Sequence, residues 1–192
     1  MARPRSDGKR KAILAAAAGL IAAAGVGAPT SKIARAAGVA DGTLFTYFRD
    51  KETLLNELFL ELKRELRHAT LGSPAAGPLV ERAHDFWNRY IKWGVSYPTK
   101  RRALRQLAVS ESVTPANKLS GRVMFAEIDT VLKAGLAGGP LRGLPTHFAG
   151  AIMVALAETT IDFIQREPKR ARAFKRAGFH AFWSAITGPN RR

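Results

Sequence analysis

The chain has 192 residues, the length of about one or two small domains and enough to bury a sizeable core. Hydrophobic residues make up 46% and charged residues 24%, which excludes a wholly disordered chain. The sequence contains no cysteine, so it excludes a disulfide scaffold, a cysteine nucleophile and a thiolate metal site. This composition is consistent with a reducing compartment.

Positive charge is the first functional clue. Lys and Arg number 31 against 15 Asp and Glu, a net charge of +16. Such a surplus favours a polyanionic partner, either nucleic acid or an anionic membrane. Residues 1–50 hold 8 basic and 3 acidic residues, and the remainder holds 23 and 12. The surplus is therefore spread along the chain, and a solvated basic surface is the alternative interpretation.

The N-terminus combines a basic segment with an apolar one. Five basic residues precede the alanine-rich run 12–24: Arg3, Arg5, Lys9, Arg10 and Lys11. Secretory signal peptides share this order. However, the larger apolar residues of the run recur at helical spacing, which favours one face of a packed helix. No apolar run reaches the roughly 18 residues of a membrane span, so we expect a cytoplasmic protein with no membrane partner.

Strand signals are scarce, and helical periodicity predicts an all-α protein of about nine helices. The first helix should cover 7–24 and end at Gly25. Two short helices should follow, at 31–37 with Thr30 as N-cap and at 41–47 with Asp41 as N-cap. Asp50 should cap the next, longer helix. The later helices are expected over 79–97, 100–111, 115–137, 146–166 and 169–186, after a loop at 72–78.

The two short helices, joined by a turn that contains Gly38, are typical of a helix-turn-helix. Apolar residues at the spacing of two packed helices are Ile33, Ala34, Ala37, Val39, Leu44 and Phe48. The outward positions are Ser31, Lys32, Arg35, Gly42, Thr43, Phe45, Thr46 and Tyr47. Because the second helix carries no acidic residue beyond its cap, it suits a DNA major groove. An ordinary helical corner with solvated charges is the alternative.

The stretch from Arg10 to Leu55 resembles the DNA-binding region of the TetR (tetracycline repressor) family of bacterial transcription regulators. The match spans roughly a quarter of the chain without a gap. It rests on Ile13 to Ala17, Gly25, Thr30, Ile33-Ala34, Ala36 to Val39, Gly42 to Phe45, Tyr47-Phe48, Lys51-Glu52 and Leu54-Leu55. The resemblance implies an N-terminal three-helix DNA-binding domain at 1–50 and a helical effector-binding and dimerisation domain at 51–192.

The resemblance also implies roles for individual residues. The helix 41–47 should enter the major groove, where Thr43 and Tyr47 contact phosphates or bases. Thr30 and Lys51 should contact phosphates, and Phe45 departs from the tyrosine common at its position. The full DNA-binding set is Thr30, Ser31, Lys32, Gly42, Thr43, Phe45, Thr46, Tyr47 and Lys51. The basic segment 3–11 is able to add affinity for the DNA backbone.

An aromatic stripe at helical spacing marks the helix 79–97. Such a stripe is typical of a core, but the resemblance implies a small-molecule pocket in this domain, and aromatic side chains commonly line such pockets. Among polar candidates, a carboxylate would suit a cationic ligand, whereas facing solvent or a partner chain is the alternative. The candidate pocket residues are Phe86, Tyr90, Trp93, Tyr97, Met124, Phe125, Ile128, Glu158, Thr159 and Asp162.

The helix 146–166 is apolar on nearly every side and needs cover from several neighbours. The resemblance implies a homodimer formed through the last two helices. The candidate interface residues are Phe148, Ile152, Phe174, Gly178, Ala181, Phe182 and Ala185. A large monomeric core is the alternative.

Signals of catalysis are missing from the sequence. The four histidines lack metal-binding spacing, and neither a nucleophile elbow nor a P-loop occurs. We predict no enzyme activity, no metal and no cofactor. The hypothesis is a repressor that binds a palindromic operator in double-stranded DNA and responds to an unknown small-molecule effector. Alternatives are a nonspecific DNA-binding protein, and a helical carrier or enzyme with a vestigial DNA-binding head.

Overall fold

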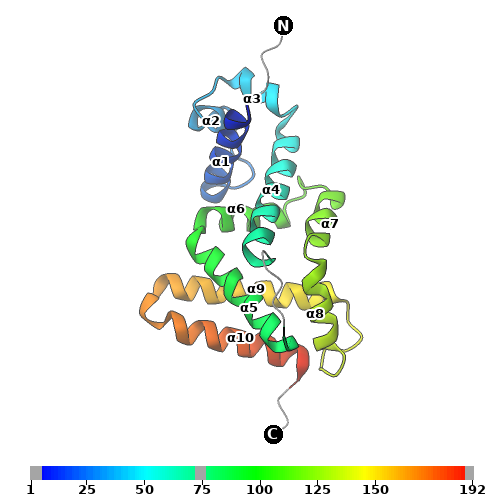
Figure 1. Cartoon of the computed structure of the whole chain (residues 1–192). Coiled ribbons are helices and arrows are strands. Elements are labelled where there is room, and N and C mark those ends of the chain that lie inside the picture. Colours follow the sequence, from blue (N-terminus) through cyan, green and yellow to red (C-terminus); the bar gives the residue numbers. More distant parts are fainter. Residues whose placement is uncertain (1–5, 72–76, 189–192) are drawn as a thin grey trace. The chain divides into compact units, whose positions relative to one another are not determined.

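The computed structural model describes residues 6–71 and 77–188 (Figure 1). These residues form helices and no strand, which confirms the all-α prediction, and the helix count is close to the nine expected. The elements are α1 Asp7–Ala24, α2 Thr30–Ala36, α3 Asp41–Tyr47, α4 Lys51–Leu71, α5 Leu79–Ser96, α6 Pro98–Val109, α7 Pro115–Val123, α8 Ala126–Leu136, α9 Thr146–Arg166, the 3₁₀ helix η1 Pro168–Arg170 and α10 Ala171–Thr187.

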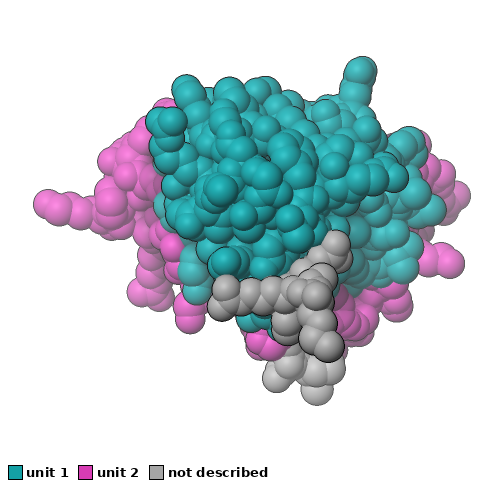
Figure 2. Space-filling view, turned by 90° about the horizontal axis from the view of Figure 1, so that it is seen from above, with its two compact units in different colours: residues 1–65, 97–124 teal, residues 66–96, 125–192 magenta. Residues whose placement is uncertain are grey.

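The chain divides into two compact units, shown in separate colours in Figure 2. Unit 1 combines residues 1–65 with 97–124, and unit 2 combines 66–96 with 125–192. Both units are therefore discontinuous in sequence, and α4 contributes to each of them. The expected division at residue 50, between a DNA-binding domain and an effector-binding and dimerisation domain, concerns function and stays a prediction.

The head of unit 1 is built by α1, α2 and α3, and α1 also packs on α6. Residues from all three helices of the head are fully buried, including Ile13, Ile33 and Leu44. Gly25 ends α1 with φ 85°, and its N–H donates to the carbonyl of Ile21 at 2.9 Å. Only glycine adopts this backbone conformation without steric cost, so the sequence stops α1 where it must turn towards α2.

The unit 1 half of α4 buries one broad apolar face, which includes Leu54, Leu58 and Leu62. Phe59 lies on this face against α7. A Cβ placed on Gly121 of α7 would lie 2.8 Å from the Phe59 ring. The side chain of any other residue would force the ring to move, so glycine at this position sets how closely α7 approaches α4 within unit 1.

Unit 2 contains α5, α8, α9 and α10, with α9 and α10 lying side by side (Figure 1). Trp87 of α5 is completely buried, and its ring stacks on Phe182 of α10 with centroids 6.1 Å apart. The indole N–H donates to the carbonyl of Lys175 at 3.1 Å. Trp87 therefore has both its apolar body and its polar edge satisfied inside the unit.

Several boundaries differ from the sequence prediction, including those of α6 and of the last helix, which is divided into η1 and α10. The single helix expected over 115–137 is two helices, α7 and α8, which break at Met124 and Phe125. The halves belong to different units, so tertiary packing splits them where no glycine or proline marks a break. Tyr97 lies outside α5, because it is the N-cap of α6, which begins at Pro98.

Among the described helices, α9 is long and apolar enough by length and composition to cross a membrane. No apolar run of that length was expected from the sequence. A single such helix is weak evidence of a span, because core helices pass the same test. In addition, α9 carries two acidic residues, Asp162 and the buried Glu158, and acidic side chains are costly inside a membrane.

Candidate nucleic-acid interface

The helices α2 and α3 divide their side chains between the core and the surface. Ile33 and Ala34 of α2 and Leu44 of α3 are buried, as predicted from the helix-turn-helix spacing. Gly38, with φ 67°, forms the tight turn between them, and the N–H of Val39 donates to the Ala34 carbonyl at 3.0 Å. The turn therefore fixes how α3 leaves α2.

The opposite faces of α2 and α3 are open. Predicted DNA-binding residues that are exposed are Ser31, Lys32, Gly42, Phe45 and Thr46, and those that are half-buried are Thr30, Thr43, Tyr47 and Lys51. None of these nine residues is buried, so each has solvent-accessible surface that DNA could contact. Phe45 is 47% exposed, so its ring is available to a partner.

The predicted caps of the two short helices are wrong. Pro29 is the N-cap of α2 and Ala40 that of α3, and neither makes a side-chain capping bond. Thr30 and Asp41 are instead the first helical residues. The amides of the first turns are thus left without a side-chain cap, as at helix N-termini that face an anion.

Tyr47 connects the end of α3 with the start of α1. Its hydroxyl oxygen accepts a hydrogen bond from the backbone N–H of Ser6 at 2.9 Å. A phenol that accepts one bond still has its own proton to donate. The pair is 41 residues apart in sequence, so no local pattern revealed it.

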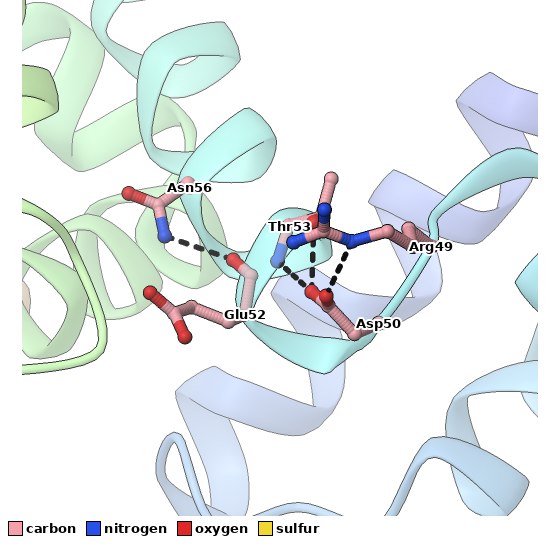
Figure 3. A network of polar contacts seen from close by, with 5 residues as sticks. All are labelled: Arg49, Asp50, Glu52, Thr53 and Asn56. Atoms are coloured by element: carbon pink, nitrogen blue, oxygen red, sulfur yellow. Dashed lines mark hydrogen bonds and ion pairs between the residues drawn. The ribbon is translucent and has the colours of Figure 1, made fainter.

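A capping network fixes the start of α4 (Figure 3). The carboxylate of Asp50 accepts from the backbone N–H and the hydroxyl of Thr53, both at 2.7 Å, and from Arg49 Nε at 2.9 Å. The predicted N-cap is thereby confirmed. The bonds from the Thr53 amide, the Thr53 hydroxyl and Arg49 lower the pKa of Asp50 from its usual 3.8 to about 2. The carboxylate is therefore ionised at neutral pH.

One turn further along α4, Asn56 holds the segment between α6 and α7. Its Nδ2 donates to the carbonyls of Glu52 at 2.9 Å and Ser112 at 2.8 Å. Its Oδ1 accepts from the backbone N–H of Thr114 at 2.9 Å and from Asn117 Nδ2 at 2.7 Å. All of its donors and both lone pairs are used. Sequence reasoning missed this residue because three of its four partners are distant in sequence.

The basic segment 3–11, which runs into α1, divides into several parts. Arg10 pairs with Glu57 of α4 at 2.6 Å and lies 5.8 Å from the centre of the Phe48 ring. It therefore braces the head, whereas Lys9 and Lys11 are exposed. Arg3 and Arg5 lie outside the described residues.

Part of the predicted pocket set gathers in unit 2. Phe86, Tyr90 and Trp93 are buried, and the Phe125 ring meets Phe86 edge-on at 6.4 Å. The Tyr90 hydroxyl donates to the carboxylate of Glu158 at 3.4 Å. A buried carboxylate is thus brought beside the Tyr90 ring of α5.

The remaining pocket candidates are dispersed. Ile128 is buried and Asp162 half-buried, whereas Thr159 is exposed, its hydroxyl donating to the Ala155 carbonyl at 3.0 Å. Tyr97 and Met124 belong to unit 1.

The candidates for a dimer interface divide in the same way. Phe148 and Ala181 are exposed, and Ile152, Phe174 and Ala185 are half-buried. By contrast, Phe182 is buried on Trp87 within the protomer, and a Cβ on Gly178 would lie 2.8 Å from that indole. Val154 and Phe163 of α9 are further exposed apolar residues, outside the set predicted from the sequence.

Comparison with known proteins finds a family model that matches the head. Residues 13–58 match the family model for bacterial regulatory proteins of the tetR family. The chain is 29% identical to a protein described as a TetR family transcription regulator from Shewanella sp. PV-4, covering 95% of this chain and 98% of that one, with a TM-score of 0.83.

Two further solved structures share the fold. A TetR family transcription regulator from Marinobacter aquaeolei VT8 is 24% identical over 94% of this chain and 96% of that one, with a TM-score of 0.76. The TetR-like regulator LfrR from Mycobacterium smegmatis, solved in complex with proflavine, is 20% identical over 94% and 98%, with a TM-score of 0.67.

Proposed function

We propose that this protein is a ligand-responsive repressor. The proposal starts from two findings: the N-terminal domain belongs to the TetR family of bacterial regulatory proteins, and the chain has the fold of TetR family transcription regulators. It binds a palindromic operator as a homodimer and acts in the cytoplasm as a regulator, not as an enzyme. Residues 1–50 bind DNA, and residues 51–192 bind the effector and dimerise.

The observation that carries this proposal is the open outer face of α2 and α3. Gly42, Phe45 and Thr46 are exposed on a seven-residue helix whose inner face buries Leu44. The only acidic residue of this helix is Asp41, at its first position. A helix of this kind enters a major groove without repelling the phosphates.

The proposed contacts differ in kind. Thr30, at the start of α2, offers its hydroxyl and the first-turn amides to a phosphate. Lys32 and Lys51 contribute ammonium groups, which bind the backbone of any sequence. Thr43 and Thr46 reach base edges, and Phe45 packs on a thymine methyl or a sugar.

The effector site is proposed in unit 2, where the Tyr90 hydroxyl donates to the carboxylate of Glu158 and the Tyr90 ring adjoins that of Phe86, which in turn meets Phe125. LfrR, which shares the fold, was solved with a small molecule, proflavine. Effector binding changes operator affinity only if it favours one conformation over another, with a coupling of typically about 1–3 kcal/mol.

Dimerisation is proposed through α9 and α10. Phe148 and Phe163 expose apolar side chains on one side of α9, because fifteen residues are about four helical turns, and a two-fold partner with the same face would cover them. A dimer also presents two copies of α3 to the two half-sites of a palindrome.

The experiment is selection of random duplex DNA by the purified protein at about 150 mM salt, read by sequencing. An enriched palindrome is the expected result. Binding without enrichment, lost as salt rises, would instead support a nonspecific DNA-binding protein. The selection is then repeated with candidate small molecules, since an effector or corepressor shifts the operator affinity of such a regulator.

A further inference from the structure

A dense group of cations lies where α9 joins α10. Residues 166–176 contain six basic residues and one acidic residue, a net charge of +5 within the chain's +16. We call this group the basic corner; its cations are Arg166, Lys169, Arg170, Arg172, Lys175 and Arg176. All of them except the half-buried Lys175 are exposed.

The inner part of the basic corner is held in place. Arg170 pairs with Glu167 at 3.1 Å and lies 4.9 Å from the centre of the Phe174 ring. Arg166 lies 5.7 Å from the Phe163 ring, and the two phenylalanine rings are 5.5 Å apart. Stacking of this kind orders a guanidinium while leaving its N–H edge open to a ligand.

The outer part consists of Lys169, Arg172 and Arg176. None of these three pairs with a carboxylate among the described residues. Arg172 and Arg176 are four residues apart on α10, a spacing at which like charges destabilise a helix. They also lie in the first two turns of α10, where the helix dipole disfavours cations. The arrangement therefore lowers the stability of the free protein.

An anionic partner would remove this cost. The cations follow one another along η1 and α10, and Cβ atoms four residues apart are about 5–6 Å from each other. Such a row suits the closely spaced phosphates of one DNA strand. Four of the six residues are arginine, which binds phosphate with two parallel hydrogen bonds. Binding of the corner to an anionic membrane is the alternative that the vesicle measurement below distinguishes.

From these observations we propose that the basic corner is a second binding surface for double-stranded DNA, outside the helix-turn-helix head. It grips the phosphate backbone and reads no sequence, with Lys169, Arg172 and Arg176 as the contacting residues. The head selects the site, and the corner adds affinity for flanking or neighbouring DNA.

The test uses the full chain and a fluorescent duplex of unrelated sequence, titrated at several salt concentrations. The variant Lys169→Gln/Arg172→Gln/Arg176→Gln is compared with Lys92→Gln/Lys133→Gln/Arg142→Gln. The control removes the same charge from exposed positions of unit 2. The corner variant should lower the slope of log affinity against log salt by about 0.9 per contact, or about 2.7 for three. The control should lower it by less than one contact.

Three results would overturn the proposal: an unchanged slope for the corner variant, equal changes for both variants, or a loss of binding to phosphatidylserine vesicles with DNA binding intact. The last result would assign the corner to a membrane. If the triple variant does not fold, Arg172→Gln/Arg176→Gln replaces it. The titration uses DNA of unrelated sequence and needs no operator. Its result therefore does not depend on whether the selection experiment finds a palindrome.

Discussion

The Oδ1 atom of Asn56 accepts a hydrogen bond from the backbone N–H of Thr114 at 2.9 Å, which ties α4 to the residues that open α7. Asn56 is 7% exposed and also bonds to Glu52, Ser112 and Asn117. The helix that follows the DNA-binding head is thereby fixed inside unit 1 by one side chain.

Asn56→Ala should therefore destabilise the protein by about 1–3 kcal/mol, because it leaves buried backbone groups without partners. Urea unfolding followed by circular dichroism measures the change. Asn88→Ala is the control: its Oδ1 is buried without a hydrogen-bond partner in the described structure, so its loss should cost little. Equal effects of the two substitutions would contradict the role given to Asn56.

Asp50 should make stability depend on acid. Because hydrogen bonding lowers its pKa from 3.8 to about 2, its contribution is fully present above pH 4 and is lost as the pH falls towards 2. The thermal midpoint of Asp50→Asn should lie below that of wild type at pH 6, and the gap should close near pH 2. The amide still accepts from Thr53, so Asp50→Ala should melt lower than Asp50→Asn. A constant gap across pH would show that the carboxylate charge is irrelevant.

Thr43 and Lys51 should separate base reading from phosphate binding. Lys51→Ala is expected to weaken binding to all duplexes alike and to reduce the salt slope by about one. Thr43→Ala should weaken some sequences more than others and leave the slope unchanged. Titration of the selected operator and of single-base variants, at several salt concentrations, measures both. The proposed placement of α3 fails if Thr43→Ala changes all sequences equally.

Much of the fold follows from local signals. Gly25, Gly38 and Asp50 end or begin elements as the sequence predicts, because each acts through its own backbone or a neighbour three residues away. Local sequence signals do not predict an element boundary that is set by packing against residues distant in sequence. The break at Met124 and Phe125 carries no glycine or proline and coincides with the border between the units.

In the candidate site, too, local signals were predictable from the sequence and distant contacts were not. The outward face of α2 and α3 was readable from helical spacing, since burial of Leu44 dictates what must point away. The network of Asn56 was not readable, because three of its four partners lie 56 to 61 residues further along the chain. Similarly, Phe182 looked available to a partner chain by spacing alone, whereas its contact with Trp87 depends on α5, far away in sequence.

Two glycines should respond in opposite directions to alanine. Gly178→Ala would place a methyl group against the Thr160 hydroxyl and 2.8 Å from the Trp87 ring, which should cost about 1–3 kcal/mol. Gly19 lies inside α1, and a methyl group added to it would meet no neighbouring atom within 4 Å, so Gly19→Ala should stabilise by about 0.5–1 kcal/mol. Urea midpoints of both variants test the packing, and a neutral Gly178→Ala would refute the close approach of α10 to α5.

The proposed dimer should depend on the exposed face of α9. Phe148 is 45% exposed at the first turn of that helix, and Phe148→Glu would place a charge where a partner's apolar side chains should lie. An uncompensated buried charge is costly, so the dimer dissociation constant should rise at least about ten-fold, or about 1.4 kcal/mol.

Sedimentation velocity over a range of protein concentrations measures this dissociation constant. Leu119→Glu is the matched control, since Leu119 is 50% exposed on α7 in unit 1. Dimerisation through α9 predicts a shift to monomer for Phe148→Glu alone. It also predicts a parallel loss of binding to the full palindrome, because a monomer presents a single α3 to one half-site. If only Leu119→Glu dissociates the protein, the interface lies on α7, and the arrangement of the two DNA-binding heads must be rebuilt from that face.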